Sequence, residues 1–334
     1  MKLGLAQGYW GAAPNPNFVE MAQEAERLGY DSVWSAEAWG NDAFTPLAWI
    51  GAQTEKIKLG TAVVQLSGRT PASCAMHALS LDYLSNGRLI LGLGVSGPQV
   101  VEGWYGRPFP KPLARTREYI DIIRQVFARE GPVTNDGPHY PLPYNGDDGM
   151  GLGKPLKPIV HPLRNELPIY MGAEGPKNIA LSTEIADGWL PLFYNPYDET
   201  VYAESLVNAR PDFQIAQMVT INITDDIPAA LMNVKRFLSF YVGGMGAKDT
   251  NFHKNLFIRM GYEAEADKIQ DLFFEGKRDE AANVIPDKLA DDLSLVGPAD
   301  RIRERLKAWE DSRVTTLLVA ASDKDTLRAM AELF

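Results

Sequence analysis

The sequence lacks the residues and runs that define several classes of protein. It has one cysteine, Cys74, so no internal disulfide can form, as is usual in a reducing cytosol. Its four histidines, at positions 77, 139, 161 and 253, lack the spacing of metal ligands, and there is no HExxH or CxxC motif. No apolar run approaches the ~18 residues of a membrane-spanning helix, and residues 1–7 are too interrupted for a signal peptide. We therefore expect a cytoplasmic protein without a metal site.

Basic residues are also in the minority. Lysine and arginine number 33 against 43 aspartates and glutamates, which gives a formal net charge of −10. Nucleic acids and anionic membranes attract clustered positive charge, so we expect neither as a partner. Hydrophobic residues make up 45% and charged residues 23%, as in ordinary globular enzymes. The composition favours an enzyme acting on a small molecule, and it leaves room for a local basic pocket.

The sequence does contain a regular alternation of short apolar runs and longer helical patterns. Most runs are apolar throughout, as is typical of parallel strands buried on both faces. Eight runs are predicted as strands: 2–7, 32–36, 58–63, 89–93, 169–172, 188–192, 214–223 and 316–320. Helices are predicted between them, for example over 17–28, 71–84 and 112–129. Alternation repeated about eight times favours a closed (β/α)8 TIM barrel, with an open doubly wound sheet as the alternative.

Two segments interrupt this rhythm. Residues 131–168 are rich in glycine and proline, and residues 225–300 have an almost wholly helical pattern. Segments of this length between elements of a compact domain are usually functional, often as lids. We expect a single barrel domain, residues 1–334, with insertions at about 131–168 and 225–300.

One glycine motif invites a nucleotide interpretation. Gly92-Leu93-Gly94-Val95-Ser96-Gly97 matches GxGxxG and follows a predicted strand. In a dinucleotide fold a helix begins on such glycines. Because Pro98 and further glycines and prolines follow, we expect no helix here and reject that interpretation. We expect the glycines instead to let the backbone approach a flat ligand closely.

A second turn has the pattern of an anion site. Ala173-Glu174-Gly175-Pro176-Lys177 follows a predicted strand and precedes a predicted helix, with proline near the first helical position. Free N–H groups at such a helix start attract anions, so a ligand phosphate is predicted here. The alternative is an ordinary connection between strand and helix.

A carboxylate ends the second predicted strand. Active sites of (β/α)8 barrels form at the carboxyl ends of the strands, which is where Glu37 is placed. Such an acid can accept a hydrogen bond from a ligand or hold a proton. A capping or salt-bridged loop acid is the alternative, and the sequence alone leaves both open.

Several of these segments together resemble the luciferase-like oxidoreductases. The resemblance is carried by residues 30–37, 57–63, 69–72, 84–94, 185–188 and 295–306, and it covers nearly the whole chain outside the two insertions. Residues 94–104, Gly-Val-Ser-Gly-Pro-Gln-Val-Val-Glu-Gly-Trp, are most similar to the branch that uses coenzyme F420, a 5-deazaflavin. That branch includes methylenetetrahydromethanopterin reductases, alcohol dehydrogenases and sugar-phosphate dehydrogenases.

The resemblance implies a site along the barrel mouth. It implies a non-proline cis peptide at Ala62–Val63, where the third strand bulges against the deazaflavin, and it places Glu37 beside the redox ring. The implied cofactor-binding residues are Gln7, Glu37, Ala38, Thr61, Ala62, Val63, Ser96, Gly97, Pro98, Gln99, Ala173, Glu174, Gly175, Pro176 and Lys177. The acidic tail of the coenzyme could meet Arg107, Lys111, Arg115, Lys154 and Lys157, unless these are scattered solvated charges.

One position departs from the family. Many relatives have histidine after the acid of the second strand, and this chain has Ala38. Glu37 is then the candidate catalytic residue, and reduction of a C=C, C=O or C=N bond is favoured slightly over alcohol oxidation. We expect F420-dependent hydride transfer in a homodimer. The alternatives are an FMN-dependent monooxygenase and a non-catalytic ligand-binding barrel.

Overall fold

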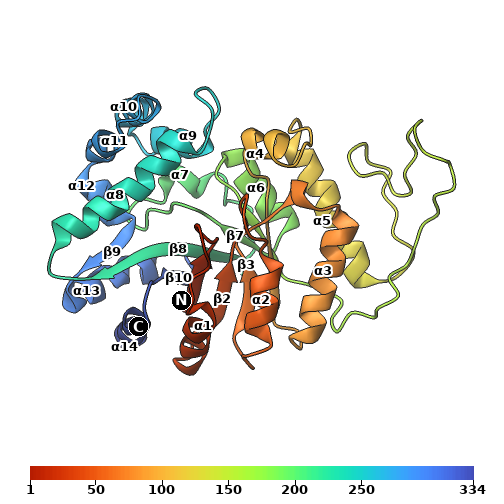
Figure 1. The fold of residues 1–334 in the computed structure, drawn as a ribbon, viewed down its shortest axis with the longest axis horizontal. Coiled ribbons are helices and arrows are strands. Elements are labelled where there is room, and N and C mark those ends of the chain that lie inside the picture. Colours follow the sequence, from red (N-terminus) through yellow and green to blue (C-terminus); the bar gives the residue numbers. More distant parts are fainter.

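The chain folds into a closed barrel of parallel strands. The structure, a computed structural model, describes all residues from 1 to 334 (Figure 1). Strands β1, β2, β3, β5, β6, β7, β8 and β10 follow one another around the barrel, and pairing of β10 with both β8 and β1 closes it. The expected TIM barrel is confirmed. The strands are β1 (Lys2–Gly8), β2 (Ser32–Ser35), β3 (Lys58–Thr61), β4 (Val64–Gln65), β5 (Leu89–Gly94), β6 (Ile169–Gly172), β7 (Gly188–Leu190), β8 (Gln214–Ile223), β9 (Ser294–Gly297) and β10 (Thr316–Ala320).

Helices surround the barrel, and none is long and apolar enough to cross a membrane. The helices expected over 17–28, 71–84 and 112–129 are α1, α3 and α5, and Gly29 follows α1 with the positive φ of +84° that favours glycine. The full set is α1 (Phe18–Arg27), α2 (Phe44–Gly51), η1 (Leu66–Gly68), α3 (Pro71–Leu84), α4 (Pro98–Gly103), α5 (Pro112–Ala128), α6 (Pro176–Ile185), α7 (Thr200–Ala203), α8 (Ile227–Gly244), α9 (Phe252–Arg259), α10 (Glu263–Phe274), α11 (Arg278–Val284), α12 (Asp287–Asp292), α13 (Ala299–Asp311) and α14 (Lys324–Leu333).

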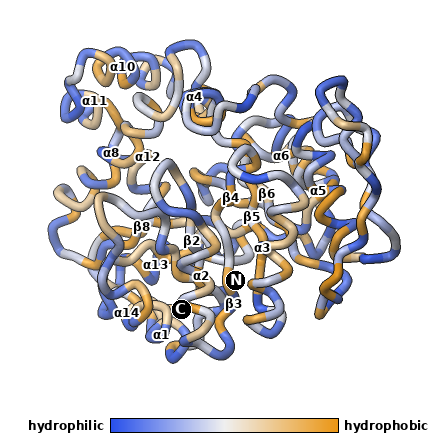
Figure 2. The backbone as a smooth tube through the Cα atoms, turned by 45° about the vertical axis from the view of Figure 1, so that its right-hand side comes forward, coloured by the Kyte–Doolittle hydropathy of each residue, from blue (hydrophilic) through white to orange (hydrophobic).

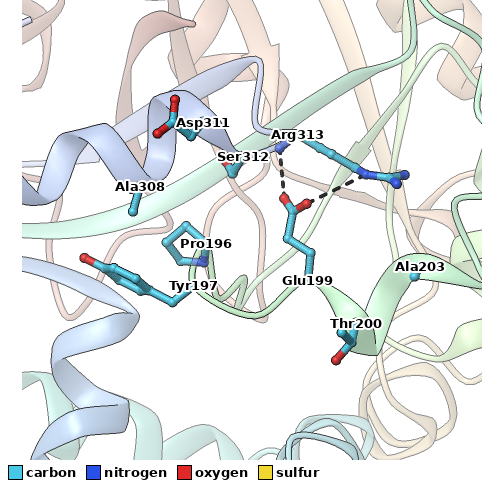
Figure 3. A pocket seen from close by; sticks show the side chains of 9 residues that line it. All are labelled: Pro196, Tyr197, Glu199, Thr200, Ala203, Ala308, Asp311, Ser312 and Arg313. Atoms are coloured by element: carbon cyan, nitrogen blue, oxygen red, sulfur yellow. Dashed lines mark hydrogen bonds and ion pairs between the residues drawn. The ribbon is translucent and has the colours of Figure 1, made fainter.

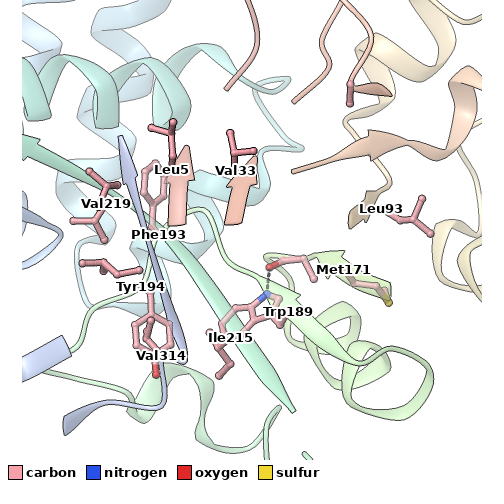
Figure 4. Packing of buried hydrophobic residues seen from close by; sticks show 14 of the residues in the cluster. Leu5, Val33, Leu93, Met171, Trp189, Phe193, Tyr194, Ile215, Val219 and Val314 are labelled. Carbon is pink, nitrogen blue, oxygen red and sulfur yellow. Dashed lines mark hydrogen bonds between the residues drawn. The ribbon is translucent and has the colours of Figure 1, made fainter. Parts of the chain in front are cut away.

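Apolar side chains fill both faces of the strands. Outward residues such as Leu5, Val33 and Trp189 belong to one large buried cluster between barrel and helices (Figure 4). Figure 2 shows the same pattern along the chain, with hydrophobic colour around β4, β5 and β6. A smaller cluster, which includes Trp34 and Tyr170, fills the barrel interior. Continuous burial explains why the strands are apolar throughout.

Two segments leave the barrel outline. Residues 129–168, here called the arm, contain no helix or strand and extend beside α3 and α5 (Figure 1). The helical insertion, α8–α12, precedes a short strand, β9, that was not expected within a helical segment. β9 pairs with β8 from Thr220 to Ile223, and Thr220 is also the last β8 residue that pairs with β10. The pattern of residues 225–300 is therefore helical only up to β9.

Candidate active site

The interior of the barrel is less deeply buried toward the carboxyl ends of its strands. Deep in the barrel the interior is closed by Trp34, whose ring lies so near Gly60 that a Cβ there would be 2.2 Å from it. Toward the carboxyl ends, Ala6, Ala62, Val63 and Met218 are only partly buried. Three of these side chains are small, and above a sealed core they make a floor on which a flat ligand can lie.

The third strand is broken at this floor. β3 ends at Thr61 and β4 begins at Val64, and the Ala62–Val63 peptide between them is cis. The expected cis peptide is therefore confirmed. The Thr61 side chain is buried, and its hydroxyl donates to the Gly92 carbonyl and accepts from the Gly92 N–H, both at 2.8 Å.

Two glycines of the GxGxxG motif lie beside this break in the third strand and leave room for it. A Cβ at Gly92 would lie 1.8 Å from the Thr61 carbonyl oxygen, and a Cβ at Gly94 would lie 2.5 Å from the Val63 side chain. The space beside both glycines is taken by the chain itself. The expectation that these glycines let a ligand approach is thus wrong for Gly92 and Gly94, because Thr61 and Val63 fill that space, whereas a Cβ at Gly97 would meet only the side chain of Gln99.

A helix does begin after the motif, contrary to expectation. Gly97 is its N-cap, and α4 runs from Pro98 to Gly103. Proline at the first helical position costs no hydrogen bond, so Pro98 starts the helix rather than preventing it. Ser96, just before, has a φ of +60°. The loop Ser96–Gln99 lies at the end of β5, as a site at the mouth requires.

Glu37 is held by an arginine that the sequence did not single out. Its carboxylate is 2% exposed and accepts from the Arg69 guanidinium at 2.9 Å through both oxygens. The backbone N–H groups of Gln65 and Ala43 donate to it at 2.8 and 3.2 Å. Burial by itself lowers the pKa of Arg69, but the Glu37 charge reverses this, and the net pKa is raised. The geometry supports the alternative of a salt-bridged loop acid.

The turn from Ala173 to Lys177 has the expected strand–turn–helix form. Gly175 caps α6, Pro176 is its first residue, and Lys177 is exposed. The Ala173 carbonyl accepts from the buried Trp189 indole at 2.8 Å. The Glu174 carboxylate accepts from the Leu192 N–H at 2.9 Å through one oxygen, which ties this turn to the loop after β7.

Unpartnered polar atoms lie around the start of α6. Asn178 Oδ1 and Arg259 Nε are buried without a hydrogen-bond partner, while another Arg259 nitrogen donates to the Glu174 carbonyl at 2.6 Å. Burial lowers the pKa of Arg259, and the Glu174 charge opposes this only in part. A buried cation beside a helix N-terminus suits an anionic group of a ligand.

The remaining predicted residues are Gln7 and the five cations that were expected to meet the acidic tail of the coenzyme. The Gln7 amide donates to the carbonyl of Phe18, the first residue of α1, so this donor is already paired within the chain. Arg107 and Arg115 both lie near Tyr140. Lys111, Lys154 and Lys157 are exposed, and Lys157 donates to the Glu130 carbonyl at 3.2 Å within the arm. The five cations do not converge on one point.

A separate cavity of about 370 Å³ lies between the loop after β7 and the end of α13 (Figure 3). Glu199 in it accepts from the Arg313 N–H at 2.9 Å, just before β10 begins. This cavity therefore lies near the amino end of β10, away from the mouth. None of the predicted site residues lines it.

Sequence reasoning missed Arg69, Arg259 and His253. Arg69 lies in the Arg-Thr-Pro segment of the family resemblance, which was a usable signal. Arg259 and His253 come from α9 in the helical insertion, where nothing in the sequence indicates contact with the turn after β6. His77, by contrast, is exposed on α3 with Nδ1 2.7 Å from the Ser73 carbonyl.

Comparison with known proteins gives one consistent result. The family model described as luciferase-like monooxygenase matches residues 5–316. A Mycobacterium tuberculosis protein named "Putative coenzyme F420-dependent oxidoreductase" is 56% identical, over 100% of this chain and 99% of its own length. A 5,10-methylenetetrahydromethanopterin reductase of Archaeoglobus fulgidus is 26% identical, over 91% of this chain and 88% of its own. The structure of the F420-dependent tetrahydromethanopterin reductase from Methanopyrus kandleri superposes with a TM-score of 0.79 at 21% identity, covering 99% of this chain and 97% of that one. The chain belongs to the luciferase-like monooxygenase family.

Proposed function

We propose that the chain is an F420-dependent oxidoreductase that transfers a hydride between the deazaflavin and a small organic substrate. The observation that carries the proposal is the 56% identity, along the whole chain, to a relative named for F420. The shape of the mouth supports it. A floor of small residues suits a planar ring system, and the start of α6 with Arg259 suits an anion.

In this proposal the protein supplies position and charge. When bound, the cofactor supplies the hydride chemistry. Ala62 and Val63, part of the floor of the mouth, would contact the ring, and Ser96–Gln99 would border it. The N–H groups at Gly175 and the Arg259 guanidinium would hold the phosphate. Glu37 and Arg69 fix the loop after β2 rather than reacting, because their charges are already paired.

Reduction of a C=C, C=O or C=N bond is the favoured direction. Both directions need a group that transfers a proton. Ala38 stands where many relatives have histidine, so the resemblance to the alcohol dehydrogenases of the family does not extend to this position.

A binding experiment separates this proposal from its rivals. Titration with F420, followed by its fluorescence, and with FMN in parallel should give tight binding of F420 only. FMN binding with oxygen uptake, and no F420 binding, would establish the monooxygenase instead. F420 binding without oxidation of the reduced cofactor by any enone, imine, aldehyde or pterin would favour the ligand-binding barrel.

A matched pair of glycine variants locates the cofactor phosphate. Gly175→Trp should weaken F420 binding at least 10-fold, because the indole would cover the N–H groups at the start of α6. Gly131→Trp, in the arm, is the control, since a side chain at either glycine would enter open space. Equal affinity of the two variants would contradict the phosphate site.

We also propose a cytoplasmic homodimer that binds neither nucleic acid nor membrane. Two neighbouring helices, α2 and α3, expose four large apolar side chains: Trp49 (61%), Met76 (66%), Tyr83 (56%) and Leu84 (80%). Apolar faces of this kind usually mark contacts between proteins. Sedimentation should show a dimer that Trp49→Glu dissociates and Phe274→Glu, an exposed aromatic on α10, does not. A wild-type monomer would overturn the proposal.

A further inference from the structure

A line of side chains crosses the barrel mouth. Tyr9 follows β1 and Glu174 follows β6, and three strands separate β1 from β6 in each direction around the barrel, so the two residues stand on opposite sides. Tyr241 of α8 has its hydroxyl beside that of Tyr9. The Tyr241 ring is 5.0 Å from the imidazole of His253, and His253 Nδ1 is 3.9 Å from Glu174 Oε2. The helical insertion thus holds His253 over the mouth.

The two facing atoms lack other partners. His253 Nδ1 and Glu174 Oε2 are both buried with no hydrogen bond, whereas Glu174 Oε1 is occupied by the Leu192 N–H. His253 Nε2 also has no partner, but it is not among the buried atoms, and the side chain is 17% exposed. The 3.9 Å between them exceeds hydrogen-bond length, and an approach of less than about 1 Å would join them. A carboxylate beside one imidazole nitrogen, with the other nitrogen open to solvent, is the arrangement from which a proton-transfer dyad forms when a ligand closes the site.

We propose that Glu174 and His253 form the acid–base dyad of this site. Glu174 holds the proton on Nδ1, and Nε2 gives or takes the proton of the reaction. A line drawn across the mouth from Tyr9 to Glu174 divides the mouth into two halves. β2, β3 and β5 lie in one half, which also contains the Ala62–Val63 bulge. His253 therefore borders the half that receives the cofactor ring. This inference rests on the proposed function.

Hydride transfer requires a group that gives or takes a proton, so that the charge on the substrate is balanced. A substrate carbon that accepts a hydride leaves an electron pair on the adjacent oxygen, nitrogen or carbon. The imidazolium of His253 gives its Nε2 proton to that atom, and solvent returns a proton to Nε2. In the opposite direction Nε2 removes the hydroxyl proton as the hydride leaves.

No other group at the mouth is as well placed. Glu37 has its carboxylate paired, Ala38 cannot transfer a proton, and His77 is exposed on the outer surface of α3. The charged and titratable groups that face His253 are Glu174 after β6, Tyr241 on α8 and, behind it, Tyr9 after β1. Arg259 lies on the same helix as His253 and bonds to the Glu174 carbonyl. Burial raises the pKa of Tyr241, and Tyr9 adds to this, so Tyr241 stays neutral near pH 7.

Nitrogen NMR tests the dyad without any turnover. In uniformly ¹⁵N-labelled protein, the imidazole signals that vanish in His253→Asn identify His253 among the four histidines. The neutral ring should carry its proton on Nδ1. In Glu174→Gln the Leu192 N–H keeps the amide oxygen, so the amide nitrogen faces Nδ1 and the proton should move to Nε2. The same tautomer in both proteins would overturn the dyad.

Kinetics test the role of the dyad. With the substrate from the enone, imine and aldehyde panel that wild type reduces, His253→Asn should lower kcat about 100-fold or more, with unchanged F420 affinity. The decrease of kcat at alkaline pH that we expect of wild type should be absent in His253→Asn. His161→Asn, in the arm, is the control, and thermal unfolding checks that each variant folds. Wild-type rate and pH profile in His253→Asn would refute this inference alone, whereas absence of F420 binding by wild type would refute the proposed function.

Discussion

Replacing Glu37 with glutamine tests whether its carboxylate stabilises the fold or takes part in the reaction. The substitution keeps the size of the side chain and removes its charge. Arg69, 15% exposed, then loses the carboxylate that binds it at 2.9 Å. A second carboxylate, that of Asp42, lies 3.8 Å from the Arg69 guanidinium and is more exposed. The arginine therefore keeps a weaker partner, and the damage should fall at the lower end of the range for broken buried ion pairs.

The magnitude follows from the burial of the pair. Removing one member of a buried ion pair costs about 3–5 kcal/mol, and the Asp42 contact places Glu37→Gln near ~3 kcal/mol. Unfolding entropies of about 2.1 cal/mol/K per residue give ~0.7 kcal/mol/K for a chain of this length, so Tm should fall by about 4 °C. In the double variant with Arg69→Met, neither charge is left buried alone. Part of the lost stability should then return.

Thermal and urea unfolding measure this effect. The control is Glu184→Gln, which removes the carboxylate of an exposed pair, with side chains 50% and 60% exposed for Arg117 and Glu184. That variant should change stability by less than ~1 kcal/mol. An unchanged Tm for Glu37→Gln, together with a 100-fold loss of turnover at full F420 occupancy, would refute the reasoning and make Glu37 the proton-transfer residue.

Three further predictions concern the barrel and its edges. Gly92→Ala should abolish soluble expression, because its Cβ would be 1.8 Å from a backbone oxygen of β3, whereas Gly103→Ala, in open space, should express normally. Burial raises the pKa of the Cys74 thiol to about 12, so a disulfide reagent at pH 8 should react with it only after denaturation. Hydrogen bonds from Arg27 and Arg328 lower the pKa of Glu24 to about 2. Its stabilisation should therefore be complete above pH 4.5 and lost as pH falls toward 2, so the difference in urea midpoint between wild type and Glu24→Gln should shrink over that range.

The barrel could be predicted because its strands are buried on both faces. That burial produces the apolar runs, and the intervening helices fix the order of the strands. β9 could not be predicted in the same way. Its four residues pair with the end of β8 from Thr220 onward, where β8 separates from β10, so its existence depends on where two other strands separate. The helix at Pro98 was missed because the proline was taken as a barrier, although it occupies the one helical position that suits it.

The parts of the candidate site that backbone groups form could be predicted from the sequence. The side chains that come from distant segments could not. The Ala62–Val63 bulge and the turn at Gly175 follow from local sequence and family resemblance. Arg69 is 32 residues from Glu37 in the chain, and Arg259 is 85 residues from Glu174. No spacing rule joins residues so far apart, and only the packing of α9 against the barrel brings the second pair together.

This division has a consequence for specificity. In the proposed site the barrel contributes a floor and backbone groups, which would recognise the flat part of a ligand but would not distinguish substrates strongly. The helical insertion contributes Tyr241 and His253, which lie in contact with each other and near Glu174, and Arg259, which lies beside the proposed phosphate site. A buried polar group discriminates between ligands because a wrong partner leaves it without a hydrogen bond. Substitutions at Tyr241 and His253 should therefore change which substrate is reduced, while substitutions at the bulge or at Arg259 should change whether the cofactor binds at all.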